Sequence, residues 1–218
     1  MTIDGPAGAG KSSAARELAR RLGFRLIDTG AMYRALAWAV RDAGLPPAES
    51  PALLALLERT RVELAGERVL VDGRDVTAEI RTPAIGELTS TLSALKPVRD
   101  KLTPMQRAMA EAGGAVLEGR DTGSVVCPDA EVKFYLDADP EARARRRREE
   151  LAARGVAVDL AAVRDEVARR DRQDTERALA PTVRPDGAVL IDSTDLDAEA
   201  VVQRLVDEVE RIRCCTPS

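Results

Sequence analysis

Eight residues near the start of the chain, Gly5-Pro6-Ala7-Gly8-Ala9-Gly10-Lys11-Ser12, match the pattern G-x-x-x-x-G-K-[ST] of a phosphate-binding P-loop. The glycines let consecutive backbone N–H groups converge on phosphate oxygens, and a helix beginning at Lys11 adds its own free N–H groups and the positive end of its dipole. In this pattern Lys11 reaches the β- and γ-phosphates, the Ser12 hydroxyl ligates a bridging Mg²⁺, and Ser13 is a further donor. The motif therefore predicts a buried strand before the loop and a phosphate site at its end.

Short apolar runs alternate with amphipathic helices on both sides of the loop, which predicts an α/β fold with a central parallel five-stranded sheet covered on both faces, a three-layer P-loop architecture. Besides the strand before the loop, the expected strands are 24–27, 115–118, 131–136 and 188–191. Only four residues, Met1, Thr2, Ile3 and Asp4, precede the loop, whereas a strand usually has about five residues, so we expect the natural first strand to begin further upstream.

Two segments depart from this alternation. Residues 61–64 and 68–72 alternate apolar and polar side chains around a turn, which predicts a hairpin in an inserted subdomain. The second segment is a pair of helices, the first rich in arginine, that meet near Gly155 and would form a lid over a bound nucleotide. We therefore expect one domain, 1–218, divided into a core of about 1–44, 95–140 and 178–213, an insertion of about 45–94 and a lid of about 141–177.

Composition excludes several kinds of chemistry. The chain of 218 residues has no histidine, which rules out His-based triads, His-ligated metals and imidazole general bases. Its net charge of −4 argues against a nucleic-acid surface. Cys127, Cys214 and Cys215 form neither a disulfide framework nor a metal site, and no apolar run reaches the ~18–20 residues of a membrane span. The expectation is a cytoplasmic protein with no membrane contact.

Polar residues follow the expected strands, at the sheet edge where ligands of such folds bind. Thr29 with Arg34, and Arg120 with Asp121, combine guanidinium groups with a hydroxyl or carboxylate, which suits an anionic acceptor carrying a polar base or sugar. A phosphate acceptor is already largely ionised at pH 7, so transfer to it requires no general base. Alternatively, Arg34 lies on a solvated helix face, Asp28 is only a helix cap, and the lid arginines pair with Glu149 and Glu150.

Six motifs in this order resemble those of bacterial cytidylate kinases over nearly the whole chain. They are Gly5–Lys11, Asp28-Thr29-Gly30-Ala31-Met32-Tyr33-Arg34, Ile80-Arg81-Thr82, Gly119-Arg120-Asp121-Thr122-Gly123, Asp171-Arg172-Gln173-Asp174 and Ile191-Asp192-Ser193-Thr194. The resemblance implies the nucleoside monophosphate (NMP) kinase fold, with the insertion as the NMP-binding subdomain. It also implies transfer of the γ-phosphoryl group of ATP, with Mg²⁺ as cofactor, to CMP or dCMP.

The resemblance also implies a role for individual residues. Thr29, Arg99 and Asp121 would contact cytosine, and Ser90, Arg170 and Asp174 would hold the pentose. Arg34, Arg120 and Arg177 would bind the acceptor phosphate, and Arg143, Arg146 and Arg147 would reach the transferring group. The expected catalytic residues are therefore Lys11, Arg120, Arg143, Arg147 and Arg177.

Other functions remain open at this point. Another P-loop kinase would differ in its acceptor alone, and a nucleotide sensor would bind ATP without turnover. A GTPase reads guanine through an Asn-Lys-x-Asp element, which this chain cannot supply because it contains no asparagine. A monomer is expected, whereas the preference between CMP and dCMP, the activity on UMP and the residues around adenine are not indicated by any motif.

Overall fold

A computed structural model describes residues 1–153 and 155–215, and the chain divides into two compact units. Unit 1 comprises Met1–Leu26, Gly114–Glu176 and Pro181–Ser218, and unit 2 comprises Ile27–Gly113 and Arg177–Ala180. No helix in the described ranges is long and apolar enough to cross a membrane.

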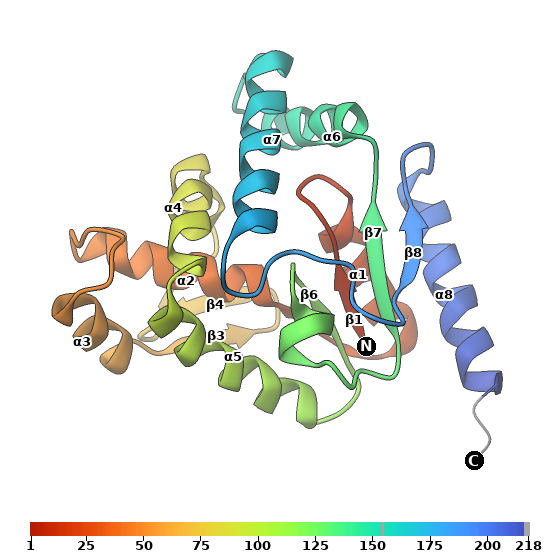
Figure 1. The fold of residues 1–218 in the computed structure, drawn as a ribbon, viewed down its shortest axis with the longest axis horizontal. Coiled ribbons are helices and arrows are strands. Elements are labelled where there is room, and N and C mark those ends of the chain that lie inside the picture. Colours follow the sequence, from red (N-terminus) through yellow and green to blue (C-terminus); the bar gives the residue numbers. More distant parts are fainter. Residues whose placement is uncertain (154, 216–218) are drawn as a thin grey trace. The chain divides into compact units, whose positions relative to one another are not determined.

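Unit 1 is built on the parallel sheet that the sequence predicts. The strand order is β2-β6-β1-β7-β8, and β1 pairs in parallel with both β6 and β7, as β7 does with β8 (Figure 1). The strands are β1 (Thr2–Asp4), β2 (Arg25–Asp28), β6 (Ala115–Glu118), β7 (Lys133–Asp137) and β8 (Val189–Asp192). Because β1 lies in the middle of the order, the P-loop that follows it leaves the sheet at its centre.

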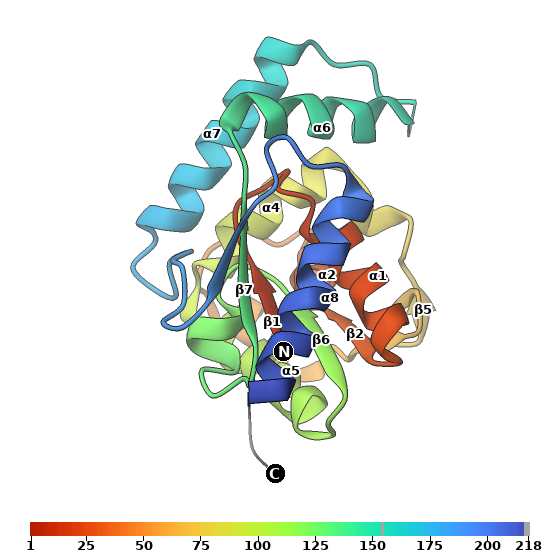
Figure 2. The same ribbon diagram turned by 90° about the vertical axis from the view of Figure 1, so that its right-hand side faces the viewer.

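Helices α1 (Lys11–Leu22) and α8 (Ala198–Cys215) pack side by side against this sheet (Figure 2). Small and apolar residues recur at helical spacing on α1, so that Ala15 and Leu18 are fully buried against the strands. Phe134 of β7 is also fully buried and lies between Ile3 of β1 and Val189 of β8 in the strand register. The core of unit 1 therefore fixes the strand that carries the P-loop.

Helices α6 (Pro140–Ala153) and α7 (Leu160–Glu176) follow β7 and pack on each other (Figure 1). Their contact is a small apolar cluster that includes Ala144, Leu151, Val163 and Val167. The rest of both helices is strongly polar, so this pair depends on few apolar contacts compared with the sheet.

Unit 2 is mainly helical and includes the expected hairpin. Its elements after β2 are α2 (Thr29–Asp42), α3 (Pro51–Arg59), β3 (Val62–Ala65), β4 (Arg68–Val71), β5 (Arg74–Asp75), a 3-10 turn (Glu79–Arg81), α4 (Pro83–Ser93) and α5 (Lys96–Glu111). The sequence predicts only the hairpin of 61–64 and 68–72, whereas the structure adds a third antiparallel strand, β5, paired with β4. Asp72 and Gly73 have positive φ values of 50° and 81°, which reverses the chain, and the fully buried Val76 holds it against β4.

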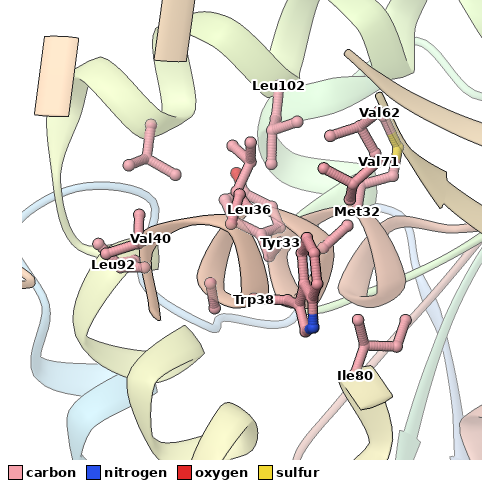
Figure 3. Packing of buried hydrophobic residues seen from close by; sticks show 14 of the residues in the cluster. Met32, Tyr33, Leu36, Trp38, Val40, Val62, Val71, Ile80, Leu92 and Leu102 are labelled. Carbon is pink, nitrogen blue, oxygen red and sulfur yellow. The ribbon is translucent and has the colours of Figure 1, made fainter. Parts of the chain in front are cut away.

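The core of unit 2 surrounds α2, whose side chains are buried on most sides (Figure 3). Met32 and Leu36 lie among residues of α4, α5 and the small sheet. Trp38, the one tryptophan in the chain, is buried in the same cluster, and the Arg74 guanidinium lies 4.7 Å from the centre of its ring.

Replacing Phe134 by alanine should lower the free energy of unfolding by about 3–5 kcal/mol, because it leaves a cavity in the closely packed centre of the sheet. The matched control is Leu190→Ala on the neighbouring strand, where the side chain is 48% exposed and the cost should stay below about 1 kcal/mol. Urea unfolding monitored by circular dichroism measures both. Equal losses in the two variants would show that the sheet core does not dominate the stability of unit 1.

Candidate active site

The P-loop approaches other backbone segments so closely that two of its glycines have no substitute. An ideal Cβ on Gly5 would lie 1.9 Å from the carbonyl oxygen of Leu136, and one on Gly8 would lie 2.7 Å from that of Arg143. Both glycines also have positive φ values, 143° and 77°. The loop is thus held between β7 and the first turn of α6, and its path depends on the absence of side chains.

Lys11 opens α1 with its side chain folded back along the loop. Its Nζ donates a 2.7 Å hydrogen bond to Pro6 O, and only 4% of the residue is exposed. Burial, together with the positive charges of Arg120 and Arg170, lowers the pKa of Lys11 to about 7. An incoming phosphate would supply the negative charge that this buried ammonium group lacks.

Asp4, directly before the P-loop, binds the segment that follows β6. Its Oδ1 accepts hydrogen bonds from Thr122 N and Thr122 Oγ1, both at 2.8 Å, and its Oδ2 accepts one from Gly123 N at 2.7 Å. The carboxyl group is fully buried, and burial raises its pKa even though the three hydrogen bonds oppose the shift. Asp4 therefore fixes the segment that carries Arg120 and Asp121.

The predicted pentose and phosphate residues of unit 1 form an ion-pair cluster. Arg120 Nε lies 3.1 Å from Asp174 Oδ2, and Arg170 Nε lies 4.0 Å from the same oxygen. Asp174 is buried and its carbonyl oxygen accepts a hydrogen bond from Thr182 N. Asp121, also buried, follows Arg120 directly. The structure thus brings Arg120 and Arg170 together around the Asp174 carboxylate, with Asp121 next to Arg120 in the chain.

Three of the arginines of α6, Arg143, Arg146 and Arg147, point to three different places. Arg143 is buried, donates to Ala7 O at 3.1 Å and forms an ion pair with Asp171 of α7. Arg147 lies 3.0 Å from Glu150 and 3.9 Å from Glu166. Only Arg143 among the three has a described contact with the P-loop.

Arg146 binds the segment after β8. It donates to the carbonyl oxygens of Ser193, Thr194 and Leu196 and to the Ser193 hydroxyl. The Ser193 hydroxyl lies 3.1 Å from the P-loop oxygen Ala9 O, to which it can donate. In this structure Arg146 organises the backbone beside the P-loop, and its expected place among the residues that reach the transferring group stays a prediction.

In unit 2, Asp28 both caps α2 and pairs with Arg34. Its Oδ1 accepts a 2.7 Å hydrogen bond from Ala31 N, and its Oδ2 lies 3.0 Å from Arg34 Nη2. Thr29, which begins the helix, is buried. The helix-cap alternative for Asp28 is confirmed, and Asp28 also holds the Arg34 guanidinium at the start of α2.

The remaining predicted residues of unit 2 gather at the end of α4. Arg99 Nη1 donates to Ser93 O at 3.2 Å, and Arg177 Nη1 lies 3.3 Å from Ser93 Oγ. Ser93 Oγ donates in turn to Ser90 O, and the buried Ser90 Oγ has no hydrogen-bond partner within the described ranges. Two guanidinium groups and an unused hydroxyl therefore converge in unit 2.

The potential metal ligands of the described residues do not gather at one place. Within residues 1–153 and 155–215, no group of three or more Asp, Glu, Cys or His side chains could hold a metal. Ser12, in the first turn of α1 beside Lys11, is exposed, so its hydroxyl is available to an ion that is bound mainly by phosphate and water.

Comparison with known proteins decides the family. The model of the cytidylate kinase family matches residues 1–211. The chain belongs to the cytidylate kinase family. It is 50% identical to the cytidylate kinase of Pelotomaculum thermopropionicum, with 96% of this chain and 95% of that protein covered, and 49% identical to that of Geobacter sulfurreducens, with 100% and 95% covered. The enzyme is therefore a kinase of nucleoside monophosphates.

The fold also resembles that of an uncharacterised protein from Eubacterium ventriosum. The TM-score is 0.52 at 13% identity, with 96% of this chain and 97% of that one covered. This likeness concerns the fold alone.

Sequence reasoning on this cytidylate kinase family member missed two acidic residues. Asp4 is the last residue of the first strand and immediately precedes the P-loop, and a carboxyl group at the end of a buried strand is a signal that could have been noticed. Asp171 belongs to a motif that carries the resemblance, yet sequence gave it no role. Its contact with the P-loop depends on how α7 packs and has no local signature.

Replacing Asp4 by alanine should lower the free energy of unfolding by about 2 kcal/mol, because Thr122 N and Gly123 N lose their buried acceptor. Because the folded-state pKa of Asp4 is raised, this carboxyl contributes most stability at low pH, and the contribution declines as pH rises through the raised pKa. Urea unfolding at several pH values measures both effects. The control is Asp129→Ala, a change at an exposed residue of the segment between β6 and β7, which Asp4 binds. Equal urea midpoints of unfolding for the two variants would contradict the assigned role of Asp4.

Proposed function

We propose that the enzyme transfers the γ-phosphoryl group of ATP to CMP or dCMP, with Mg²⁺ as cofactor, giving CDP or dCDP in pyrimidine nucleotide metabolism. The observation that supports this most directly is the set of cations around the P-loop in unit 1. Arg143 contacts the loop, and Arg120 and Arg170 are near enough to Lys11 to lower its pKa. Phosphoryl transfer requires little beyond alignment and neutralisation of charge, which such a cluster provides.

In this mechanism the P-loop, Gly5 to Ser13, binds the phosphates of ATP through its backbone N–H groups, and Lys11 binds the β- and γ-phosphates. Arg143 neutralises charge on the phosphoryl group in transfer, and Arg147 of the lid is a further candidate for this role. Arg34, Arg120 and Arg177 neutralise the acceptor phosphate. Mg²⁺, held by Ser12 and the phosphates, would supply charge neutralisation between them. No general base is required because the acceptor phosphate is ionised.

We assign the acceptor nucleoside to the remaining polar residues. Thr29, Arg99 and Asp121 would read cytosine, whose amino group is a donor beside ring acceptors. Ser90, Arg170 and Asp174 would bind the pentose. The unpartnered Ser90 Oγ and the ion pair of Arg170 with Asp174 support this assignment, since each offers a hydroxyl or carboxylate to a sugar.

We also propose that residues 45–94 act as the NMP-binding insertion and 141–177 as the lid, on a core of about 1–44, 95–140 and 178–213. The enzyme would act as a monomer in the cytoplasm, with ATP and CMP or dCMP as its partners. Two alternatives remain, a sensor that binds ATP without turnover and a kinase with another acceptor. Comparing ADP formation with different monophosphates distinguishes them from the proposed function.

ADP formation from MgATP should be confined to cytosine acceptors. We expect kcat/KM for CMP and dCMP to exceed that for AMP, GMP or TMP by at least about 100-fold, since unpaired polar groups in the base site penalise the wrong base. A coupled assay with each monophosphate, UMP included, and with no acceptor measures this. A preference for another monophosphate would contradict the base-site assignment, and ATP binding without any turnover would favour the sensor.

The affinity for ATP should fall as pH rises above about 7, because the ligand-free Lys11 loses its proton there whereas the phosphate-bound form must be charged. The expected slope approaches a tenfold loss per pH unit, as for any binding step that takes up one proton. Lys11→Arg is the control, since a guanidinium stays charged throughout this range. Calorimetric titration with MgATP between about pH 6 and 9 measures both proteins, and identical slopes would refute the assigned role of Lys11.

A further inference from the structure

Asp171 of α7 contacts the P-loop directly. Its Oδ1 accepts a 3.3 Å hydrogen bond from Ala7 N, and its Oδ2 forms an ion pair with Arg143 Nη1. Arg143 Nη1 also donates to Ala7 O at 3.1 Å. The Asp171 carboxylate, the Arg143 guanidinium and the backbone N–H and C=O of Ala7 therefore form a closed triangle, entirely within unit 1.

This triangle is held from several sides. Arg143 Nε donates to Ala138 O at 2.9 Å, and the first turn of α6 packs against Gly8. The side chains of Arg143 and Asp171 are 8% and 19% exposed, so water screens their charges only weakly. Thr175 Oγ1 donates to Asp171 O on the same helix, which steadies the backbone there.

Both partners of Asp171 are groups that a phosphate oxygen requires. The P-loop motif offers backbone N–H groups such as that of Ala7 to phosphates, and a guanidinium binds phosphate and carboxylate with the same geometry. Among protein side chains, a carboxylate is the nearest equivalent of a phosphate oxygen in charge and in accepting hydrogen bonds. We propose that Asp171 occupies the place of a phosphate oxygen in the ligand-free enzyme and releases Ala7 and Arg143 when the polyphosphate of the nucleotide binds.

Two other acidic groups of α7 have different partners. Asp174 pairs with Arg120 and Arg170, and Glu166 lies toward Arg147. Asp165 is exposed, with no contact to the loop in the described ranges. The position of Asp171 is therefore specific to one residue of the helix and is not a general consequence of an acidic face.

This exchange sets the affinity for nucleotide. Every binding event replaces the Asp171 contacts, so the measured affinity is lower than that of a loop left open. Arg143 meanwhile stays ordered at the loop and does not have to be recruited. Asp171 is thus a positioning residue for Arg143 and a competitor of the ligand. The inference rests on the proposed function, since it takes the P-loop as the ATP site.

Asp171→Asn tests the proposal because it keeps the size of the side chain and removes its charge. We expect the dissociation constants of MgATP and of inorganic tripolyphosphate to fall by about fivefold or more, since the effect concerns phosphate and not adenine. Calorimetric titration at constant pH and ionic strength measures both ligands. Asp165→Asn, the same change at an exposed site of α7, should leave both constants unchanged.

Asp171→Glu keeps the charge, so its dissociation constants for both ligands should stay closer to those of the wild type than the constants of Asp171→Asn do. Asp171→Ser serves as the second neutral variant if the asparagine variant does not fold. Unchanged or weaker binding of both ligands by the folded neutral variant would overturn the inference, because a residue that only supports the loop would lose affinity on replacement. If the wild type itself bound neither ATP nor tripolyphosphate, the proposed function would fail as well. Binding by the wild type without any gain in the variant would overturn this inference alone, so the two failures are distinguishable.

Discussion

The burial of several positive charges around one loop is the constraint on which the rest of unit 1 depends. Two like charges about 4 Å apart repel by about 4 kcal/mol at the effective dielectric constant of a protein surface, and more when water is excluded. The ligand-free enzyme tolerates Lys11, Arg120, Arg143 and Arg170 together because Asp171, Asp174 and backbone carbonyl oxygens oppose them. A binding site for a highly charged anion is therefore assembled before the anion arrives. The repulsion among its positive charges is offset by acidic groups and carbonyl oxygens of the protein.

Covalent continuity then determines how this site is aligned with the sheet. Asp4 is the last residue of β1, and the P-loop begins with the next residue. The same Asp4 holds the start of the turn at Thr122–Val126, which follows Arg120 and Asp121. One strand end thus fixes both the loop assigned to ATP and a segment assigned to the acceptor, so that a shift of β1 would move the two together.

The features that could be predicted from the sequence are those with a local signal, and the features that were missed depend on packing. The P-loop, the alternation of strands and helices and the hairpin at 61–72 have their own periodicity or turn residues, and the parallel five-stranded sheet follows from them. The short strand β5 was missed because its pairing relies on positive φ values at Asp72 and Gly73. In the sequence of α6, Arg143, Arg146 and Arg147 cannot be told apart by any local signal. Their separate destinations, at Ala7, at Ser193 and at Glu150, follow only from the position of α6 in the folded chain.

The scarcity of aromatic residues has a consequence for spectroscopy. Trp38, the only indole in the chain, lies in the core of unit 2 with a guanidinium on its ring. Tryptophan emission consequently reports the surroundings of α2. A fluorescence titration with either nucleotide would therefore follow the packing of unit 2 without any label, because the one indole is built into its core.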